Sequence, residues 1–132
     1  MPDVKIVVFI DDETHNIRVM KRAFTSRNKW FLHAFQSPQE ALDLIDLGRI
    51  TPDLVITDHY MPVIQGYELL KQIHKTHPRS FRVLTSANED IIEKISQYNE
   101  FQCVVNAVLF KPWSRDRIDE ILKLYEDQLQ PI

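Results

Sequence analysis

The chain has 132 residues, a length that suits one domain, and a hydrophobic content of 44% is typical of a globular protein with a real core. The net charge of −3, without any run of lysine or arginine, argues against a nucleic-acid-binding surface. A single cysteine excludes an internal disulfide, and no segment approaches the ~20 apolar residues of a membrane-spanning helix. The amino terminus lacks the features of a secretory signal, so we expect a cytoplasmic protein.

Strand and helix patterns alternate from the start of the chain. The apolar run Ile6–Ile10 predicts a buried strand, and apolar residues at helical spacing then predict a helix over about Thr14–Arg27. Trp30–Phe35 is predicted as a short second strand. Ser37 begins a capping box with proline at the first helical position, and Gly48 can cap the end of that helix.

The third unit repeats this order. Leu54–Thr57 predicts a third strand. Gly66 opens a helix whose apolar face ends before Pro78, since proline cannot continue a helix. Phe81–Leu84 then predicts the fourth strand.

The last part of the chain completes the pattern. A fourth helix carries apolar residues from Ile91 to Ile95, with Tyr98 as a further candidate. Ala107–Phe110 predicts the fifth strand, and Ser114 can cap a final amphipathic helix. Strands that alternate with helices of this length predict an α/β fold with a doubly wound, five-stranded parallel sheet, (βα)5, covered on both faces.

Four of these strands end on residues that can handle phosphate. The residues are Asp11 with Asp12, then Asp58, Thr85 and Lys111. In an open parallel sheet the ligand crevice lies beyond the carboxyl ends of the strands, so we expect these side chains to meet there.

The combined charges point to metal and phosphoryl chemistry. Three carboxylates in one cleft repel one another and need a counter-charge, and carboxylates with room for water suit Mg²⁺. Asp58 stands alone at a central strand end and is the best-placed nucleophile for forming an aspartyl phosphate, whereas the pair Asp11-Asp12 suits metal holding. Thr85 and Lys111 could bond the phosphoryl oxygens. The chain has only two glycines, which disfavours a glycine-rich phosphate loop.

In this order the motifs resemble a known family. They are Asp11-Asp12-Glu13, Asp58 followed by Met61-Pro62 and Gly66, Thr85-Ser86, and Lys111-Pro112. The combination resembles the receiver (CheY-like) domain of two-component response regulators, with a flavodoxin-like fold, over essentially the whole chain. We therefore expect residues 1–132 to be a single receiver domain, either stand-alone or cut from a longer response regulator, with no output domain in this chain.

The resemblance implies roles at the acidic end of the site. Asp58 would accept a phosphoryl group from a histidine kinase or a phosphotransfer protein. Asp12 would bind Mg²⁺ directly, with Asp11 acting through water or as a second ligand, and with Asp58 and the backbone carbonyl of Tyr60 completing the protein ligands.

It also implies roles for the surrounding residues. Thr85 would move to bond the phosphoryl group and Lys111 would pair with it. The Lys111-Pro112 peptide bond would be cis. Met61 and Pro62 would shape the loop after the acceptor, and Gly66 would permit the turn into the next helix.

Two departures from the family pattern concern the output. Many receivers carry an aromatic switch residue three positions before the lysine, where this chain has Val108. We hypothesise that coupling runs through Thr85 without such a switch, with Phe110 or Trp113 contributing. The segment from Thr85 to Lys111 is also a few residues longer than usual, which predicts a longer fourth helix or an enlarged loop before the fifth strand.

The leading interpretation is a signalling switch that catalyses only its own phosphorylation and dephosphorylation, and that changes the binding of an output domain or partner protein. Direct binding of nucleic acid or membrane is not expected, and a homodimer is left open. Two alternatives remain. One is an aspartyl-phosphate-forming phosphohydrolase, although such enzymes usually have an acid–base aspartate where this chain has Tyr60. The other is an adaptor that keeps the fold but works without phosphorylation.

Overall fold

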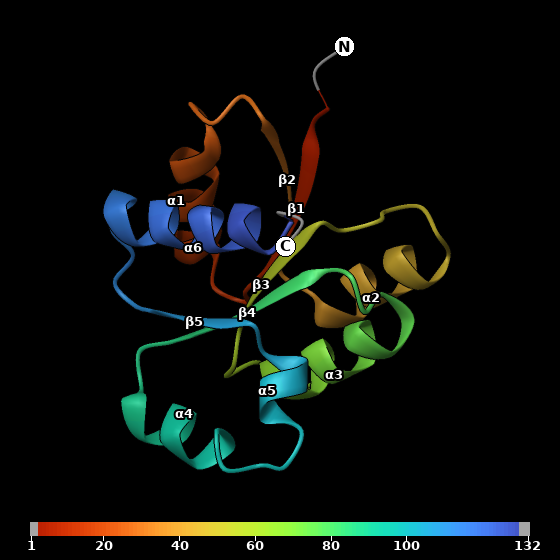
Figure 1. Ribbon diagram of the computed structural model, residues 1–132, viewed down its shortest axis with the longest axis vertical. Coiled ribbons are helices and arrows are strands. Elements are labelled where there is room, and N and C mark those ends of the chain that lie inside the picture. The colour runs from red at the N-terminus through yellow and green to blue at the C-terminus, as the bar shows by residue number, and fades with distance from the viewer. Residues whose placement is uncertain (1–2, 130–132) are drawn as a thin grey trace.

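The computed structural model describes residues 3–129 and has one parallel five-stranded sheet (Figure 1). The strand order is β2-β1-β3-β4-β5, which is the predicted doubly wound α/β arrangement. The strands are β1 Lys5–Ile10, β2 Trp30–Phe35, β3 Leu54–Asp58, β4 Phe81–Ser86 and β5 Ala107–Phe110. Because β1, β3 and β4 have neighbours on both sides, their carboxyl ends lie at the middle of one sheet edge.

Helices cover both faces of the sheet (Figure 1). The helices are α1 Thr14–Phe24, α2 Pro38–Asp46, α3 Gly66–Thr76, α4 Glu89–Ile95, α5 Phe101–Val104 and α6 Arg115–Gln128. One hydrophobic core joins α1 and α6 to the sheet, and the other joins α2, α3, α4 and α5 to its opposite face. Within the described residues, no helix is long and apolar enough to cross a membrane.

Helix caps explain several of the boundaries. The Ser37 hydroxyl accepts a hydrogen bond from Glu40 N at 3.2 Å, as the capping box predicts. Gly48 ends the same segment with a φ of 74°, the left-handed conformation that glycine adopts without steric cost. Ser114 accepts from Arg117 N at 3.1 Å and so caps α6.

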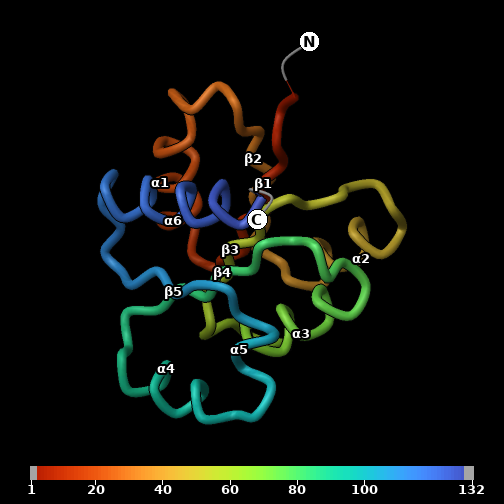
Figure 2. Tube along the Cα trace, viewed as in Figure 1, coloured from red at the N-terminus to blue at the C-terminus, as the bar shows by residue number. Residues whose placement is uncertain are grey.

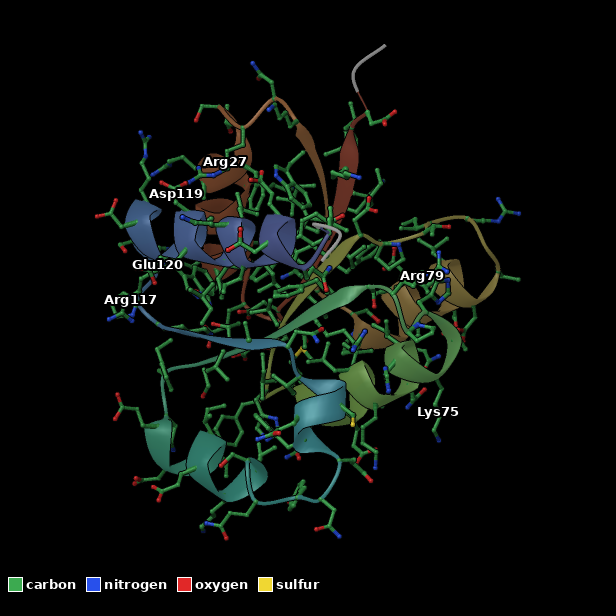
Figure 3. The ribbon with its side chains drawn as sticks, viewed as in Figure 1. Arg27, Lys75, Arg79, Arg117, Asp119 and Glu120 are labelled. Carbon is green, nitrogen blue, oxygen red and sulfur yellow. The ribbon has the colours of Figure 1, made fainter. Side chains whose placement is uncertain are left out.

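The first helix is shorter than predicted. It ends at Phe24 rather than near Arg27, because Thr25 N turns back to the carbonyl of Arg22. The Arg27 guanidinium reaches back to the Ala23 carbonyl and also pairs with Asp119 on α6 at 2.6 Å (Figure 3). The residues after Phe24 therefore join α1 to α6 instead of extending α1.

The sequence predicted either a longer fourth helix or an enlarged loop before the fifth strand, and the structure has an enlarged segment rather than a longer helix. The helix α4 ends at Ile95, and the added length forms a turn followed by the separate helix α5, which lies beside α3 (Figure 2). Tyr98 leaves the helical path and packs edge-on against Tyr67 of α3, with ring centroids 5.4 Å apart, while Phe101 stacks on the same ring. Aromatic packing on α3 thus stabilises the extra segment.

A buried arginine fastens α5 to the sheet. The side chain of Arg82, on β4, donates to the carbonyls of Val104 at 2.8 Å and Cys103 at 3.1 Å, and also to Pro78 and Ser80. The carbonyls of Cys103 and Val104 are among the last carbonyls of α5, which have no partner within the helix. Burial lowers the pKa of Arg82. Among residues 3–129, its hydrogen-bond acceptors are backbone carbonyls and the Ser80 hydroxyl, and none is a carboxylate.

Candidate functional site

Side-chain alternation brings the predicted site residues to one face of the sheet. Four of them lie two positions after a core residue that faces α1 and α6, so these four point to the same side. The pairs are Phe9 and Asp11, Ile56 and Asp58, Val83 and Thr85, and Leu109 and Lys111. Backbone hydrogen bonds from Asp11 N to Phe35 O, at 3.0 Å, and from Lys111 N to Ser86 O, at 3.0 Å, continue the ladder past the strand ends.

The acidic pocket consists of Asp11, Asp12 and Asp58. One carboxylate oxygen of each lies within 4.8 Å of the others. Lys111 Nζ lies 2.9 Å from Asp58 Oδ1 and 3.3 Å from Asp11 Oδ2. One ammonium group therefore faces two of the three carboxylates, and the pocket keeps an excess of negative charge.

The two aspartates after β1 have different surroundings. Asp11 is fully buried, and its carboxylate accepts hydrogen bonds from Glu13 N at 2.9 Å and from the Asn16 side chain at 3.0 Å. The side chain of Asp12 is exposed. Asp11 is thus held in place by the start of α1, whereas Asp12 is free to reach an ion from the solvent side.

Electrostatics set Asp58 apart. Burial raises the pKa of Asp58 above the ordinary value of 3.8, and Asp11 and Asp12 raise it further, while the hydrogen bond and charge of Lys111 act in the opposite direction. Burial alone would lower the pKa of Lys111, but its hydrogen bond to Asp58 and the charge of Asp11 raise it overall. Lys111 therefore stays protonated and available to an anion.

Thr85 lies directly beside Asp58. The two residues are paired in the register of β3 and β4, and Thr85 is fully buried. Its hydroxyl donates to the carbonyl of Leu109 at 2.5 Å and accepts from Trp113 Nε1 at 2.8 Å. In this state, the proton of the Thr85 hydroxyl points toward β5 and away from the Asp58 carboxylate.

The loop after Asp58 approaches its backbone closely. A Cβ atom at Gly66 would lie 2.1 Å from the Asp58 carbonyl oxygen, so glycine is required by space and not by an unusual φ. Met61 is buried under this loop, whereas Pro62 and Tyr60 are exposed at its surface. The Lys111-Pro112 bond is cis, as the resemblance implied.

Two neighbours of the site point elsewhere. His59 is buried on the opposite face of the sheet, where its Nδ1 accepts from Tyr67 N at 3.4 Å. Burial lowers the pKa of His59, which fits this acceptor role. Val108 is half-buried and pairs in register with Leu84, so it too faces the core opposite to Thr85.

Two contacts of the site were not assigned from the sequence. The Asn16 side chain bonds Asp11, and a hint was available because a polar residue in the first turns of α1 can face the strand end. Trp113 was predicted to contribute to the output. Its hydrogen bond to Thr85 joins residues 28 positions apart, so no local sequence pattern could predict that bond.

Comparisons with known proteins agree with this architecture. Residues 7–123 match the model of the response regulator receiver domain. The DNA-binding transcriptional regulator NtrC of Klebsiella pneumoniae is 31% identical over 130 residues, which cover 95% of this chain and 26% of that protein. The chain thus spans about a quarter of the length of this regulator and of its Escherichia coli K12 counterpart.

Solved structures share the fold. The signal receiver domain of an HD domain-containing protein from Pseudomonas fluorescens Pf-5 matches with a TM-score of 0.81 and 23% identity, covering 95% of this chain and 96% of that chain. A CheY-like receiver domain protein from Methanospirillum hungatei JF-1 matches with a TM-score of 0.81 and 19% identity, covering 96% and 98%. With the acidic pocket at the expected sheet edge, this chain belongs to the response regulator receiver domain family.

Proposed function

We propose that this receiver is a phosphoacceptor switch in which Asp58 takes a phosphoryl group from the phosphohistidine of a histidine kinase or phosphotransfer protein. The observation that carries the proposal is the contact of the Asp58 carboxylate with Lys111 Nζ, at 2.9 Å, beside Asp11 and Asp12. A nucleophile, an acidic pocket and a cation thus lie together at the strand ends, where phosphoryl ligands of such sheets bind.

The chemical step needs little beyond positioning and charge. A carboxylate oxygen of Asp58 forms a bond to phosphorus while the P–N bond of the phosphohistidine breaks, and the donor imidazole leaves with the bonding electron pair. Lys111 is placed to bind the oxygens of the new phosphoryl group, because its ammonium already contacts the Asp58 carboxylate. Its contact with Asp11 would then compete with the phosphoryl group for the same nitrogen.

The donor set of the pocket fits Mg²⁺. Its oxygens are carboxylates within 4.8 Å of one another, one of them on the exposed residue Asp12, which leaves room for water ligands. We propose that Asp12 and Asp58 bind the ion, that Asp11 acts directly or through water, and that the carbonyl of Tyr60 completes the protein ligands. A bound Mg²⁺ would neutralise charge on the transferring phosphoryl group.

A groove beside the site offers access to a partner. It is lined by His15, Asn16 and Val19 of α1 and, across from them, by Ala87, Lys111, Pro112 and Trp113. Lys111 belongs both to this groove and to the acidic pocket, so a protein seated in the groove would reach Asp58 from the side of α1. This arrangement suits a donor histidine that is presented by another protein.

The adduct with beryllofluoride tests the proposal, because BeF₃⁻ mimics a phosphoryl group on an aspartate. In the presence of Mg²⁺, ¹⁹F NMR should show bound fluoride resonances for the wild-type chain and none for Asp58→Asn. The variant Asp46→Asn, which changes an exposed aspartate at the end of α2, should bind like the wild type. Binding that persists in Asp58→Asn, or that is missing from the wild type, would refute an acceptor role for Asp58.

A further inference from the structure

The hydroxyl of Thr85 is bonded on both sides. A threonine hydroxyl has one proton to donate, and Thr85 donates it to the Leu109 carbonyl at 2.5 Å. The indole N–H of Trp113 donates to the same oxygen at 2.8 Å. To donate to a phosphoryl group on Asp58, the hydroxyl must turn away from Leu109 and lose or rearrange its bond with Trp113.

The Trp113 indole also contacts Phe9 and Lys111. Its ring packs edge-on against Phe9 of β1, with centroids 5.5 Å apart and planes at 86°, and Lys111 Nζ lies 5.5 Å from its centroid. The side chain is half-buried, so one part contacts the core while another reaches the groove beside α1. Trp113 therefore contacts both Thr85 and Lys111, the two residues proposed to bind the phosphoryl oxygens.

We propose that Trp113 is a positioning residue for Thr85, which holds the hydroxyl in its resting orientation and opposes its movement toward Asp58. The proposal rests on the proposed function, since it concerns the movement of Thr85 toward the phosphorylated aspartate. A group that binds one of two states more tightly shifts the balance toward that state. The bond from Trp113 is made in the resting state, so it lowers the apparent affinity of the site for a phosphoryl mimic.

This arrangement also gives the switch a route to the surface. Val108 occupies the usual aromatic position but faces the opposite core, whereas Trp113 contacts Thr85 and lines the groove. Movement of the Thr85 hydroxyl toward Asp58 breaks or rearranges its bond with the indole N–H, so the position of the Trp113 ring in the groove depends on the state of Thr85. A protein seated there would sense the state of Thr85 through Trp113.

The variant Trp113→Phe tests the positioning role. Phenylalanine keeps an aromatic ring against Phe9 and near Lys111 but has no N–H to donate. We expect the affinity for BeF₃⁻ with Mg²⁺, measured by titration calorimetry, to rise about fivefold, the size of one neutral hydrogen bond. Trp30→Phe is the matched control, because Trp30 packs against Phe24 and Tyr125 away from the site, and its affinity should not change.

A double-mutant cycle separates this role from general packing. Valine at position 85 has no hydroxyl, so Trp113→Phe made in a Thr85→Val background should leave BeF₃⁻ affinity unchanged. An equal gain in both backgrounds, or no gain in the wild-type background, would overturn the proposal. If the wild-type chain itself binds no BeF₃⁻, the proposed function fails instead, and the two failures are thus distinguishable.

A second measurement needs no change at Trp113. In a Trp30→Phe chain, Trp113 is the remaining tryptophan, and its indole N–H gives one resonance in a ¹H–¹⁵N spectrum. Addition of Mg²⁺ and BeF₃⁻ should shift this resonance, and the shift should be much smaller in Trp30→Phe/Thr85→Val. A resonance that stays in place on BeF₃⁻ binding would show that Trp113 keeps its bond, contrary to the proposal.

Discussion

The ammonium group of Lys111 lies 2.9 Å from Asp58 Oδ1, and the same nitrogen lies 3.3 Å from Asp11 Oδ2. One ammonium group therefore contacts two buried carboxylates. A carboxylate oxygen of Asp12 lies within 4.8 Å of an oxygen of each of them. The pKa of Asp58 is raised in spite of this contact, mainly by burial. The ionised form of Asp58 therefore destabilises the folded protein, as is common for charged groups in functional sites.

Asp58→Asn should stabilise the protein at neutral pH by roughly 1 kcal/mol, because it removes a charge that the fold disfavours. A carboxyl with a raised folded-state pKa binds more protons in the native than in the unfolded state. Its contribution to stability is present below the unfolded pKa of about 3.8 and is lost as the pH rises through the higher folded value. The advantage of Asp58→Asn should therefore be largest at pH 7 and should shrink toward acid pH.

Urea unfolding of both proteins between pH 4 and pH 7, without Mg²⁺, measures this difference. Asp46→Asn serves as the control, since Asp46 is exposed and should show no such dependence. A lower stability of Asp58→Asn at pH 7 would mean that the ion pair with Lys111 outweighs burial.

Gly66→Ala should destabilise the fold by about 3 kcal/mol and impair reaction at Asp58. The added Cβ would lie 2.1 Å from the Asp58 carbonyl oxygen, so the loop must move away from the acceptor strand. Gly48→Ala is the matched control, because its Cβ meets no atom within 4 Å and its φ of 74° costs only about 1 kcal/mol. Equal losses in the two variants, measured by thermal unfolding, would contradict the close approach at Gly66.

Arg82→Met should destabilise the protein by about 3 kcal/mol, because the carbonyls of Cys103 and Val104 lose their buried donor. Arg79→Met provides the control, since Arg79 is exposed (Figure 3). Hydrogen exchange should show the loss first in α5 and the turn before it. Unchanged protection there would mean that stacking of Phe101 on Tyr67 holds α5 without the arginine.

Val108→Ala should leave the response to BeF₃⁻ nearly intact. Val108 faces the core opposite to Thr85, so its side chain has no contact path to the hydroxyl that we propose to move. Chemical-shift changes on addition of Mg²⁺ and BeF₃⁻ should match those of the wild type outside the immediate surroundings of residue 108. A broad loss of these chemical-shift changes would show that Val108 takes part in coupling the site to the output surface.

Local patterns predicted most of this fold because each element carries its own period and caps. The strands, the Ser37 capping box and the convergence of Asp58 with Lys111 needed only short-range signals and the rule for parallel sheets. The end of α4 was missed because Tyr98 continues the helical spacing, while its actual partner is Tyr67 on another helix.

The other missed features depend on contacts between distant residues. Arg82 lies in an apolar strand, which signals a buried charge, but the α5 carbonyls that it binds follow more than 20 positions later. The bond from Trp113 to Thr85 depends on how the loop after β5 returns over β1. Such tertiary contacts leave no periodic trace in a single sequence.

The most direct test of the central claim is phosphorylation itself. Incubation with Mg²⁺ and acetyl phosphate, followed by intact-protein mass spectrometry, should show the gain of one phosphoryl group by the wild-type chain and by Asp46→Asn. The Asp58→Asn chain should gain none, and hydroxylamine should remove the group from the wild type, as expected for an acyl phosphate. A stable phosphoryl group on Asp58→Asn, or no gain by the wild type, would contradict the assignment of Asp58 as the acceptor.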